Sequence, residues 1–465
     1  MDELTGKKLV ILGLARQGKA LAQFAADVGA EVVVSDLRPA EKLGQDLTEL
    51  ARLDIKIVLG EHPMSLLDKT DILAISGGVP ADAPLVQAAQ SRGIRITNDS
   101  LEFARRSPAA VIGITGSAGK TTTTALTGVM AQMSGRQTWV GGNIGRPLIA
   151  DLHKMAPDDI IVQELSSFQL ELWTQSPPVA AVLNITPNHL DRHKSMSAYS
   201  AAKANILRYQ TTAGVAVLSA DDAGAMALRD LVQGRLRMFS LRWQINDGAF
   251  VNQEKIWLRD GMRELAVCNL DDIQLRGWHN VLNVLAAVTL ADSVGIPVEA
   301  IRRAIQTFKG VEHRLELVRT INGVQYINDS IATAPERVIA ALDAIEQPII
   351  LLAGGRDKQM VWQPWAEKVL GKVKAVVLFG DLAPLLEKHL QTAAEPVETP
   401  AEPVEAKGPP ILRTETMAAA LETAAKLAEA GDVVLLSPGG TSYDAFADFE
   451  ERGRAFRELV NGISD

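Results

Sequence analysis

Short apolar runs that stop at a glycine or a polar residue alternate along this chain with stretches whose apolar positions follow helical spacing. The runs predict strands at residues 8–13, 31–35, 55–59, 71–76, 111–114, 160–164, 180–185, 324–327, 348–353 and 433–436. The run at 180–185 is apolar at nearly every position, which is typical of a strand buried on both faces of a parallel sheet. Strands separated by helices predict an α/β fold.

The length of the chain sets the expected number of domains. With 465 residues, 47% of them hydrophobic, the chain is too long for one compact core. We expect three domains, at residues 1–105, 106–308 and 309–465. Each should contain a mainly parallel sheet flanked by helices: a Rossmann-like domain, a P-loop ATPase-like domain and a second Rossmann-like domain.

The net charge and the cysteine content indicate which kinds of binding partner and which cellular compartment to expect. The 47 basic and 56 acidic residues give a net charge of -9, which argues against a nucleic-acid partner and favours a small-molecule substrate. The single cysteine, Cys268, can form no intramolecular disulfide, and we expect it to be a small buried side chain. Because the start lacks the regions of a signal peptide and no apolar run could cross a bilayer, we expect a cytoplasmic protein that does not bind membranes.

The run at 111–114 leads into Thr-Gly-Ser-Ala-Gly-Lys-Thr, a strand, a tight turn and a helix start. Gly116 and Gly119 would let successive backbone amides face an anion at the helix N-terminus. Lys120 would reach the outer phosphates of a nucleoside triphosphate, and the Thr121 hydroxyl would bind magnesium. The general P-loop pattern has glycine where Ile114 stands, so a glycine turn that binds nothing is the alternative.

A second glycine turn, at residues 13–18, follows the first predicted strand. It could receive a diphosphate, with Asp36 and Arg38 at the next strand end, where a ribose or base would lie. Ala15 occupies the middle glycine position of the dinucleotide fingerprint. A dinucleotide site and a purely structural turn are therefore both open.

Polar residues at other strand ends suggest further parts of a site. Glu164 is placed to hold magnesium, or else belongs to a helix cap near Ser166. His189 suits a metal or phosphate site, although a histidine in a loop is often only a satisfied polar residue. Asn280 could pair with an adenine edge or cap a helix. Lys203, on a helix of small residues, reads by its chemistry alone as a solvated lysine.

Five motifs occur in a fixed order: residues 115–121 (TGSAGKT), 141–145 (GGNIG), 164–170 (ELSSFQL), 188–193 (NHLDRH) and 279–280 (HN). Together they resemble the Mur ligases, and the resemblance covers all three predicted domains. Within that family the chain is closest to the members that use ATP to join D-glutamate to UDP-N-acetylmuramoyl-L-alanine through an acyl phosphate, in peptidoglycan precursor synthesis. The resemblance implies a monomer with ATP, two magnesium ions and these two small-molecule substrates.

The resemblance also implies a role for each motif residue. The UDP-substrate would contact Gly13, Arg16, Gln17, Asp36, Arg38, Ser76 and Asn143. ATP would contact Gly116, Ser117, Gly119, Lys120, Thr121, Thr122, Asn280, Arg314 and Asp329, the last two when the third domain closes. The magnesium ligands would be Thr121, Glu164, His189 and Lys203, with Lys203 carried as a carbamate. Lys120, His189 and Lys203 would be the catalytic residues.

The third domain carries the expected amino-acid pocket. By resemblance Thr333, Lys358, Ser442 and Phe449 would bind D-glutamate, the cation meeting an acidic side chain. His313 and Arg314 belong to a polar connector that resembles the family's hinge and could otherwise be an exposed charged linker. The chain departs from the family in two motifs: Ile331 and Ala334 replace a lysine and an asparagine, and Gly439, Gly440 and Thr441 replace Ala-Cys-Ala.

A proline- and glutamate-rich segment at 392–410 predicts a flexible surface insertion with no catalytic part. The alternative functions are a related ligase that adds another amino acid, including the folate polyglutamylating type, and a non-ligating P-loop nucleotidase. A dehydrogenase would use only the first glycine turn. It would leave the ATP loop unexplained.

Overall fold

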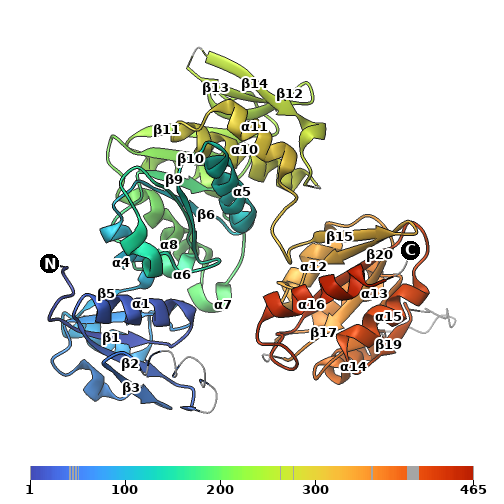
Figure 1. Ribbon diagram of the computed structural model, residues 1–465, viewed down its shortest axis with the longest axis horizontal. Coiled ribbons are helices and arrows are strands. Elements are labelled where there is room, and N and C mark those ends of the chain that lie inside the picture. The colour runs from blue at the N-terminus through green and yellow to red at the C-terminus, as the bar shows by residue number, and fades with distance from the viewer. Residues whose placement is uncertain are drawn as a thin grey trace. The chain divides into compact units, whose positions relative to one another are not determined.

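The protein is described here by a computed structural model covering residues 2–40, 43, 47, 50, 52–261, 263–275, 277–357, 360–394 and 408–463. Three mainly parallel sheets follow one another along the chain (Figure 1). The chain divides into two compact units, Met1–Phe308 with the first two sheets and Lys309–Asp465 with the third. The expected α/β fold of three domains is confirmed.

The first sheet has five parallel strands in the order β3-β2-β1-β4-β5. Its elements are β1 (Lys8–Leu12), α1 (Arg16–Asp27), β2 (Glu31–Asp36), β3 (Ile55–Leu59), β4 (Ile72–Ile75), α3 (Pro84–Ser91), β5 (Arg95–Thr97) and α4 (Asp99–Arg106). The strand order reverses at β1, whose neighbours are β2 and β4. The carboxyl ends of these strands therefore form the switch point at which open α/β sheets bind ligands.

The second sheet has nine strands in the order β14-β13-β12-β11-β10-β9-β6-β8-β7, in which β13 runs antiparallel to both of its neighbours, β12 and β14. Its strands are β6 (Val111–Thr115), β7 (Thr138–Gly142), β8 (Ile160–Glu164), β9 (Val179–Val182), β10 (Val215–Ser219), β11 (Arg235–Ser240), β12 (Asp247–Asn252), β13 (Lys255–Asp260) and β14 (Arg263–Asn269). Its helices are α5 (Lys120–Met133), α6 (Ser167–Leu170), α7 (Leu190–His193), α8 (Met196–Arg208), α9 (Ala223–Met226), α10 (Trp278–Ser293) and α11 (Val298–Thr307).

Strand β9 is buried on both faces, as its apolar sequence predicts. Val179 and Ala181 belong to the core cluster that includes α5 and α10, whereas Ala180 and Val182 pack into the cluster that includes α8. The strand ends at Val182, so the expected extension to residue 185 is wrong. Cys268 is buried, as expected.

The third sheet has six strands in the order β15-β16-β20-β17-β18-β19, with β15 antiparallel to the rest. Its elements are β15 (Glu316–Ile321), β16 (Val324–Asn328), α12 (Pro335–Asp343), β17 (Ile349–Gly354), α13 (Gln363–Lys372), β18 (Ala375–Phe379), α14 (Ala383–Ala394), β19 (Ile411–Arg413), α15 (Met417–Leu427), β20 (Val433–Gly439) and α16 (Phe449–Asn461). Most of the expected insertion at 392–410 lies outside the described residues. No helix among the residues listed above is long and apolar enough to cross a membrane.

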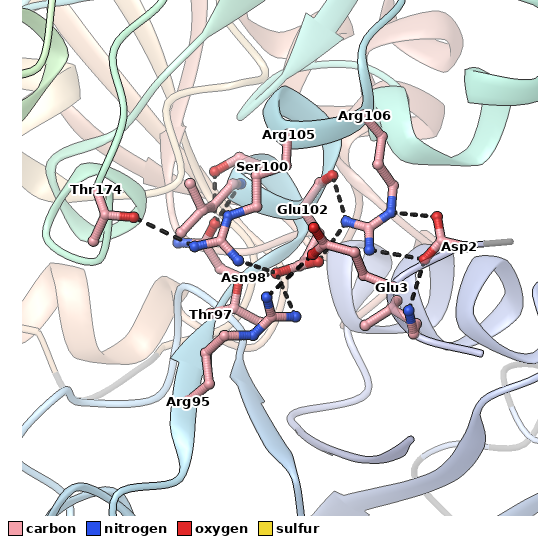
Figure 2. A network of polar contacts seen from close by, with 12 residues as sticks. Asp2, Glu3, Arg95, Thr97, Asn98, Ser100, Glu102, Arg105, Arg106 and Thr174 are labelled. Atoms are coloured by element: carbon pink, nitrogen blue, oxygen red, sulfur yellow. Dashed lines mark hydrogen bonds and ion pairs between the residues drawn. The ribbon is translucent and has the colours of Figure 1, made fainter. Parts of the chain in front are cut away.

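A buried polar network surrounds α4, the segment that connects the first two sheets (Figure 2). Glu102 is 0% exposed and accepts hydrogen bonds from Thr97 Oγ1 at 2.7 Å and from Arg106 Nη1 at 2.5 Å. Arg106 also pairs with Asp2 through Nε at 2.7 Å. Arg105 Nη2 donates to Thr174 Oγ1 at 3.4 Å, in the segment between α6 and β9 that leads into the second sheet. The network ties the N-terminal segment, the first sheet and the second sheet to one helix.

A Glu102→Gln substitution is expected to lower the free energy of unfolding by about 3 kcal/mol. It removes the fully buried carboxylate that pairs with Arg106 and lies 3.4 Å from Arg105, and it leaves Arg106 with its pair to Asp2. Urea unfolding measures this loss. The control is Glu299→Gln, since Glu299 is mostly exposed in its pair with Arg302 and should lose less than about 1 kcal/mol. Equal midpoints for the two variants would contradict a structural role for the network.

Candidate functional site

The glycine turn between β6 and α5 has a geometry that its sequence only partly predicts. Ile114 is fully buried in β6 beside Glu164 of β8, so the turn begins only at Gly116 and needs no glycine at position 114. Gly119 caps α5 with φ of +83°. A Cβ on Gly119 would lie 2.2 Å from Asn283 Oδ1 in α10, so glycine is required by both conformation and space.

Two amides of this turn are hydrogen-bonded to Asn184, which lies two residues after the end of β9. Ser117 N donates to Asn184 O at 3.0 Å, and Ala118 N donates to Asn184 Oδ1 at 2.8 Å. The Lys120 ammonium bonds back to Gly116 O at 2.8 Å and to Ser117 O at 3.2 Å. The turn is thus held in shape by contacts within the protein, and anion binding by its amides stays a prediction. Thr121 and Thr122 occupy the first turn of α5, both buried.

Glu164 ends β8 beside this turn and is only 1% exposed. Its Oε1 accepts a hydrogen bond from Asn143 Nδ2 at 2.8 Å, while no described residue hydrogen-bonds to its buried Oε2. The helix cap is formed instead by Ser166, which bonds reciprocally with Gln169. The capping alternative for Glu164 is therefore wrong, and among the described residues its buried Oε2 has no hydrogen-bond partner.

Lys203 is buried, not solvated: it lies on α8 and is 1% exposed. Its Nζ donates to Gly116 O at 2.8 Å and to Thr115 Oγ1 at 3.3 Å, and lies 4.8 Å from the centre of the Tyr199 ring. Burial, and after it the charge of Lys120, holds the pKa of Lys203 well below its usual value, although Glu164 acts in the opposite direction. The amine beside the turn therefore loses its proton more easily than an exposed lysine does.

These residues fit a divalent cation only in part as they stand. Among the residues that the structure describes, no group of three or more histidine, cysteine or acidic side chains could hold a metal. Glu164 offers one unpaired oxygen near the turn, and the buried Thr121 could add a hydroxyl. A further oxygen ligand would have to come from a modified side chain or from the bound nucleotide.

His189 lies before α7 with φ of +53° and is exposed. Its ring packs edge-on against Phe168 at 5.1 Å, and Phe168 in turn stacks on His193 at 5.2 Å. Arg192 covers the Phe168 ring at 4.4 Å and donates to Gly77 O at 2.8 Å. The loop that carries His189 is thus fixed against the loop that follows β4 of the first sheet.

Asn280 is the third residue of α10 and does not cap it; the cap residue is Gly277 and makes no side-chain bond. The capping alternative is wrong. Asn280 Oδ1 accepts a hydrogen bond from Asn283 Nδ2 at 3.0 Å, and Asn283 contacts Gly119 of the glycine turn between β6 and α5. Asn280 is therefore positioned beside that turn.

In the first sheet, Asp36 holds the glycine turn. It accepts hydrogen bonds from Leu14 N at 2.6 Å and from the Arg38 guanidinium at 2.8 and 2.9 Å. Burial raises its pKa, but the bonds from Arg38 and the backbone outweigh burial and bring the value to about 2. Ser76 Oγ donates to Gly13 O at 2.9 Å. The expected turn is shorter than residues 13–18, since α1 already begins at Arg16.

The start of α1 reaches the second sheet through Arg16, whose Nη2 donates to Asn143 O at 3.3 Å. Asn143 also donates from its side chain to Glu164, so it connects the start of α1 to the end of β8. Gln17 and Ser76 line a small enclosed space together with Asp99 of α4. Burial raises the pKa of Asp99 to about 6. The sequence did not indicate Asp99 as part of this site, because an aspartate at the start of a helix is typically a helix cap.

In the second unit, the connector is not an exposed linker. His313 is 3% exposed, and its Nδ1 lies 3.0 Å from Asn328 Nδ2. Arg314 is half-buried. Asp329 follows β16 and accepts bonds from Ser437 Oγ at 2.8 Å and from Leu315 N at 3.2 Å. Burial raises the pKa of Asp329 to about 7, and these hydrogen bonds offset only part of that rise.

An Asp329→Asn substitution is expected to stabilise the protein near pH 8 but not near pH 4. The folded pKa of about 7 lies above the ordinary 3.8. Between these values the native state therefore holds a proton that the unfolded chain has lost, and stability falls as pH rises. The asparagine variant escapes this loss, so its advantage should reach about 2 kcal/mol above neutral pH. Urea unfolding at both pH values measures it, and an advantage of equal size at both would contradict it.

The remaining expected residues lie at strand ends of the third sheet. Ser442 is buried after β20, Thr333 is half-buried after β16, and Phe449 begins α16 with its ring 6.5 Å from that of His313. Lys358 lies outside the described residues. Gly439 has φ of +75°, and a Cβ there would lie 3.1 Å from the Trp362 ring. At Gly439, where the family has alanine, the Trp362 ring thus lies close to the backbone.

Three sequence profiles of one family match the chain: "Mur ligase MurD-like, N-terminal domain" at residues 7–98, "Mur ligase middle domain" at 114–291 and "Mur ligase, glutamate ligase domain" at 313–440. UDP-N-acetylmuramoylalanine–D-glutamate ligase of Symbiobacterium thermophilum is 41% identical over 463 residues, 98% of each chain. The enzyme of the same name from Clostridium kluyveri is 39% identical over 458 residues, covering 98% of this chain and 97% of its own.

Solved structures resemble the fold. UDP-N-acetylmuramate-alanine ligase from Thermotoga maritima has a TM-score of 0.58 at 20% identity, over 98% of this chain and 99% of its own. A pseudomurein peptide ligase type C from Methanothermus fervidus has a TM-score of 0.54 at 19% identity, over 99% of this chain and all of its own. At these identities the likeness concerns the three-domain architecture alone.

Proposed function

The chain belongs to the Mur ligase family, and on this premise we propose that it is the ATP-dependent ligase that adds D-glutamate to UDP-N-acetylmuramoyl-L-alanine in peptidoglycan precursor synthesis. Relatives that carry this activity in their names are 37–41% identical over nearly the whole chain. The observation that carries the proposal is the position of Asn143: Arg16, at the start of α1, donates to its backbone oxygen, and its side chain donates to Glu164 beside the glycine turn between β6 and α5.

Residues 1–105 bind the UDP end of the substrate in this proposal. The contact residues are Gly13, Arg16, Gln17, Asp36, Arg38, Ser76 and Asn143. Asp36 and Ser76 act by shaping the glycine turn, to which they are already bonded, while Arg16 and Arg38 supply positive charge for the diphosphate.

Residues 106–308 bind ATP and the magnesium ions. Gly116, Ser117, Gly119, Lys120, Thr121, Thr122 and Asn280 contact the nucleotide. Thr121, Glu164, His189 and a carbamate on Lys203 hold the cations, which neutralise phosphate charge when bound. Because a carbamate forms only on a neutral amine, the burial of Lys203 and its lowered pKa favour this modification.

Residues 309–465 complete the site with Arg314 and Asp329 toward ATP and with Thr333, Lys358, Ser442 and Phe449 toward D-glutamate. We propose a monomer that works in the cytoplasm, where ATP and the nucleotide precursor are available. The departures at Ile331 and at 439–441 are the places to look if the amino-acid substrate differs.

The reaction begins with attack of the alanyl carboxylate on the γ-phosphate of ATP, which gives an acyl phosphate and ADP. The amine of D-glutamate then displaces phosphate and forms the amide. Two anions must approach in the first step, and Lys120 offsets their repulsion. In this proposal its ammonium exchanges its bonds to the carbonyl oxygens of Gly116 and Ser117 for bonds to phosphate.

The deciding experiment measures phosphate release from ATP with UDP-N-acetylmuramoyl-L-alanine present, adding D-glutamate, L-glutamate, L-lysine or no amino acid. Release together with a product larger by one glutamate, seen only with D-glutamate, is the expected result. Product with a different amino acid would identify a related ligase. Release without any amide product would identify a nucleotidase.

A further inference from the structure

Arg452 of α16 is a fully buried cation that no proposed step uses. It is 0% exposed. Its Nε donates to Ser330 Oγ at 3.0 Å, its Nη2 to Ser330 O at 2.9 Å, and both Nη atoms to Gly440 O at 3.2 Å. Within the part of the chain that the structure describes, no carboxylate pairs with this guanidinium.

A second buried arginine differs from Arg452 because its charge is paired with carboxylates. Arg237 is 1% exposed, but it pairs with Asp247 and Asp292, each at 2.7 Å. Burial lowers the pKa of Arg452 to about 10, which the charge of Asp444 only partly offsets, so the group stays charged at neutral pH. Burying a charge without a paired opposite charge costs several kcal/mol. The positive charge is therefore not explained by the stability of the fold.

The position of Arg452 connects the segments assigned to D-glutamate. Ser330 lies three residues before Thr333, and Gly440 lies two residues before Ser442. Ser330 Oγ also donates to the carbonyl oxygen of Phe449 at 2.8 Å. The same guanidinium thus holds the loops after β16 and β20 at the carboxyl ends of the sheet, where ligands of open α/β sheets bind.

We propose that Arg452 is a positioning and specificity-determining residue that fixes these two loops and leaves uncompensated positive charge beneath them, so that the pocket selects an amino acid with two carboxylates. The inference rests on the proposed function, because it takes Thr333, Ser442 and Phe449 as the pocket. Hydrogen bonds to carbonyl oxygens leave the full cationic charge in place, and an acidic side chain entering above the loops compensates it.

The test compares Arg452→Met, Arg452→Lys and wild type in steady-state ligation with D-glutamate and with D-glutamine. The methionine variant should raise KM for D-glutamate about tenfold and lower the preference for D-glutamate over D-glutamine by a similar factor, with KM for ATP unchanged. The lysine variant keeps the charge but loses the planar fork, so its KM should rise while its preference is retained.

The control is Arg237→Met, which removes a buried arginine of the first unit and should lower the melting temperature without changing either KM. The inference is overturned if Arg452→Met keeps the wild-type preference, or if Arg452→Lys loses it to the same extent. If Arg452→Met does not fold, the test depends on Arg452→Lys. Retained preference for D-glutamate then supports the inference, and lost preference overturns it. Failure of the proposed function is distinguishable, since wild type would then form no product with D-glutamate.

Discussion

Replacing Glu164 with glutamine is expected to lower kcat about 1,000-fold while leaving the melting temperature unchanged or higher. The side chain is 1% exposed, and no described group bonds its Oε2. Without a cation, that buried negative charge is a cost to the folded state. Glutamine has the same shape and can still accept the bond from Asn143, so the fold should keep its geometry and lose only the charge that attracts magnesium.

Kinetics and thermal melting with and without magnesium and ATP check this prediction. The magnesium-dependent rise in melting temperature should disappear in Glu164→Gln. The matched control is Asp159→Asn, at the other end of β8, because Asp159 is also buried but accepts bonds from Trp139 Nε1 at 2.7 Å and Ala156 N at 2.9 Å. That variant should lose stability and keep the magnesium effect. Full activity in Glu164→Gln would remove Glu164 from the cation site.

The sheets could be predicted because their signal is local. In β20, Val433 and Leu435 pack into one core cluster while Val434 and Leu436 pack into the other, and a run of apolar residues is sufficient to indicate such a strand. The strand ends then indicate Glu164, Asp329 and Ser442, because carboxyl ends of parallel strands lie at one edge. Which side chains carry which chemistry depended on the family resemblance.

Contacts between distant segments could not be predicted. Lys203 reads as solvated because its neighbours on the helix are small, yet Gly116 and Tyr199 enclose its amine. Arg452 stands in a run of charged residues that is typical of an exposed helix face. Asn184 gives no motif of its own, although it holds the phosphate turn. In each case burial is created by elements that come together only in the folded sheet.

Lys203→Met is the second substitution with a large expected effect: kcat should fall about 1,000-fold, while the melting temperature at neutral pH should rise. The activity falls because methionine can neither form a carbamate nor donate to Gly116 O. The stability rises because the folded pKa of Lys203 lies well below the ordinary 10.5. The native state therefore binds this proton less tightly than the unfolded chain does, which favours unfolding, and that disadvantage of lysine shrinks as pH rises toward 10.5.

Melting curves of both proteins from neutral pH upward, in buffers free of metal and carbon dioxide, check the stability, and a difference that does not depend on pH would contradict it. Binding of ¹³C-labelled carbon dioxide, followed by NMR, checks the modification: wild type should show a carbamate signal that Lys203→Met lacks. A lysine kept only for packing would not lose activity and gain stability in the same substitution. Both results together are expected only if this amine is buried for the chemistry that it performs.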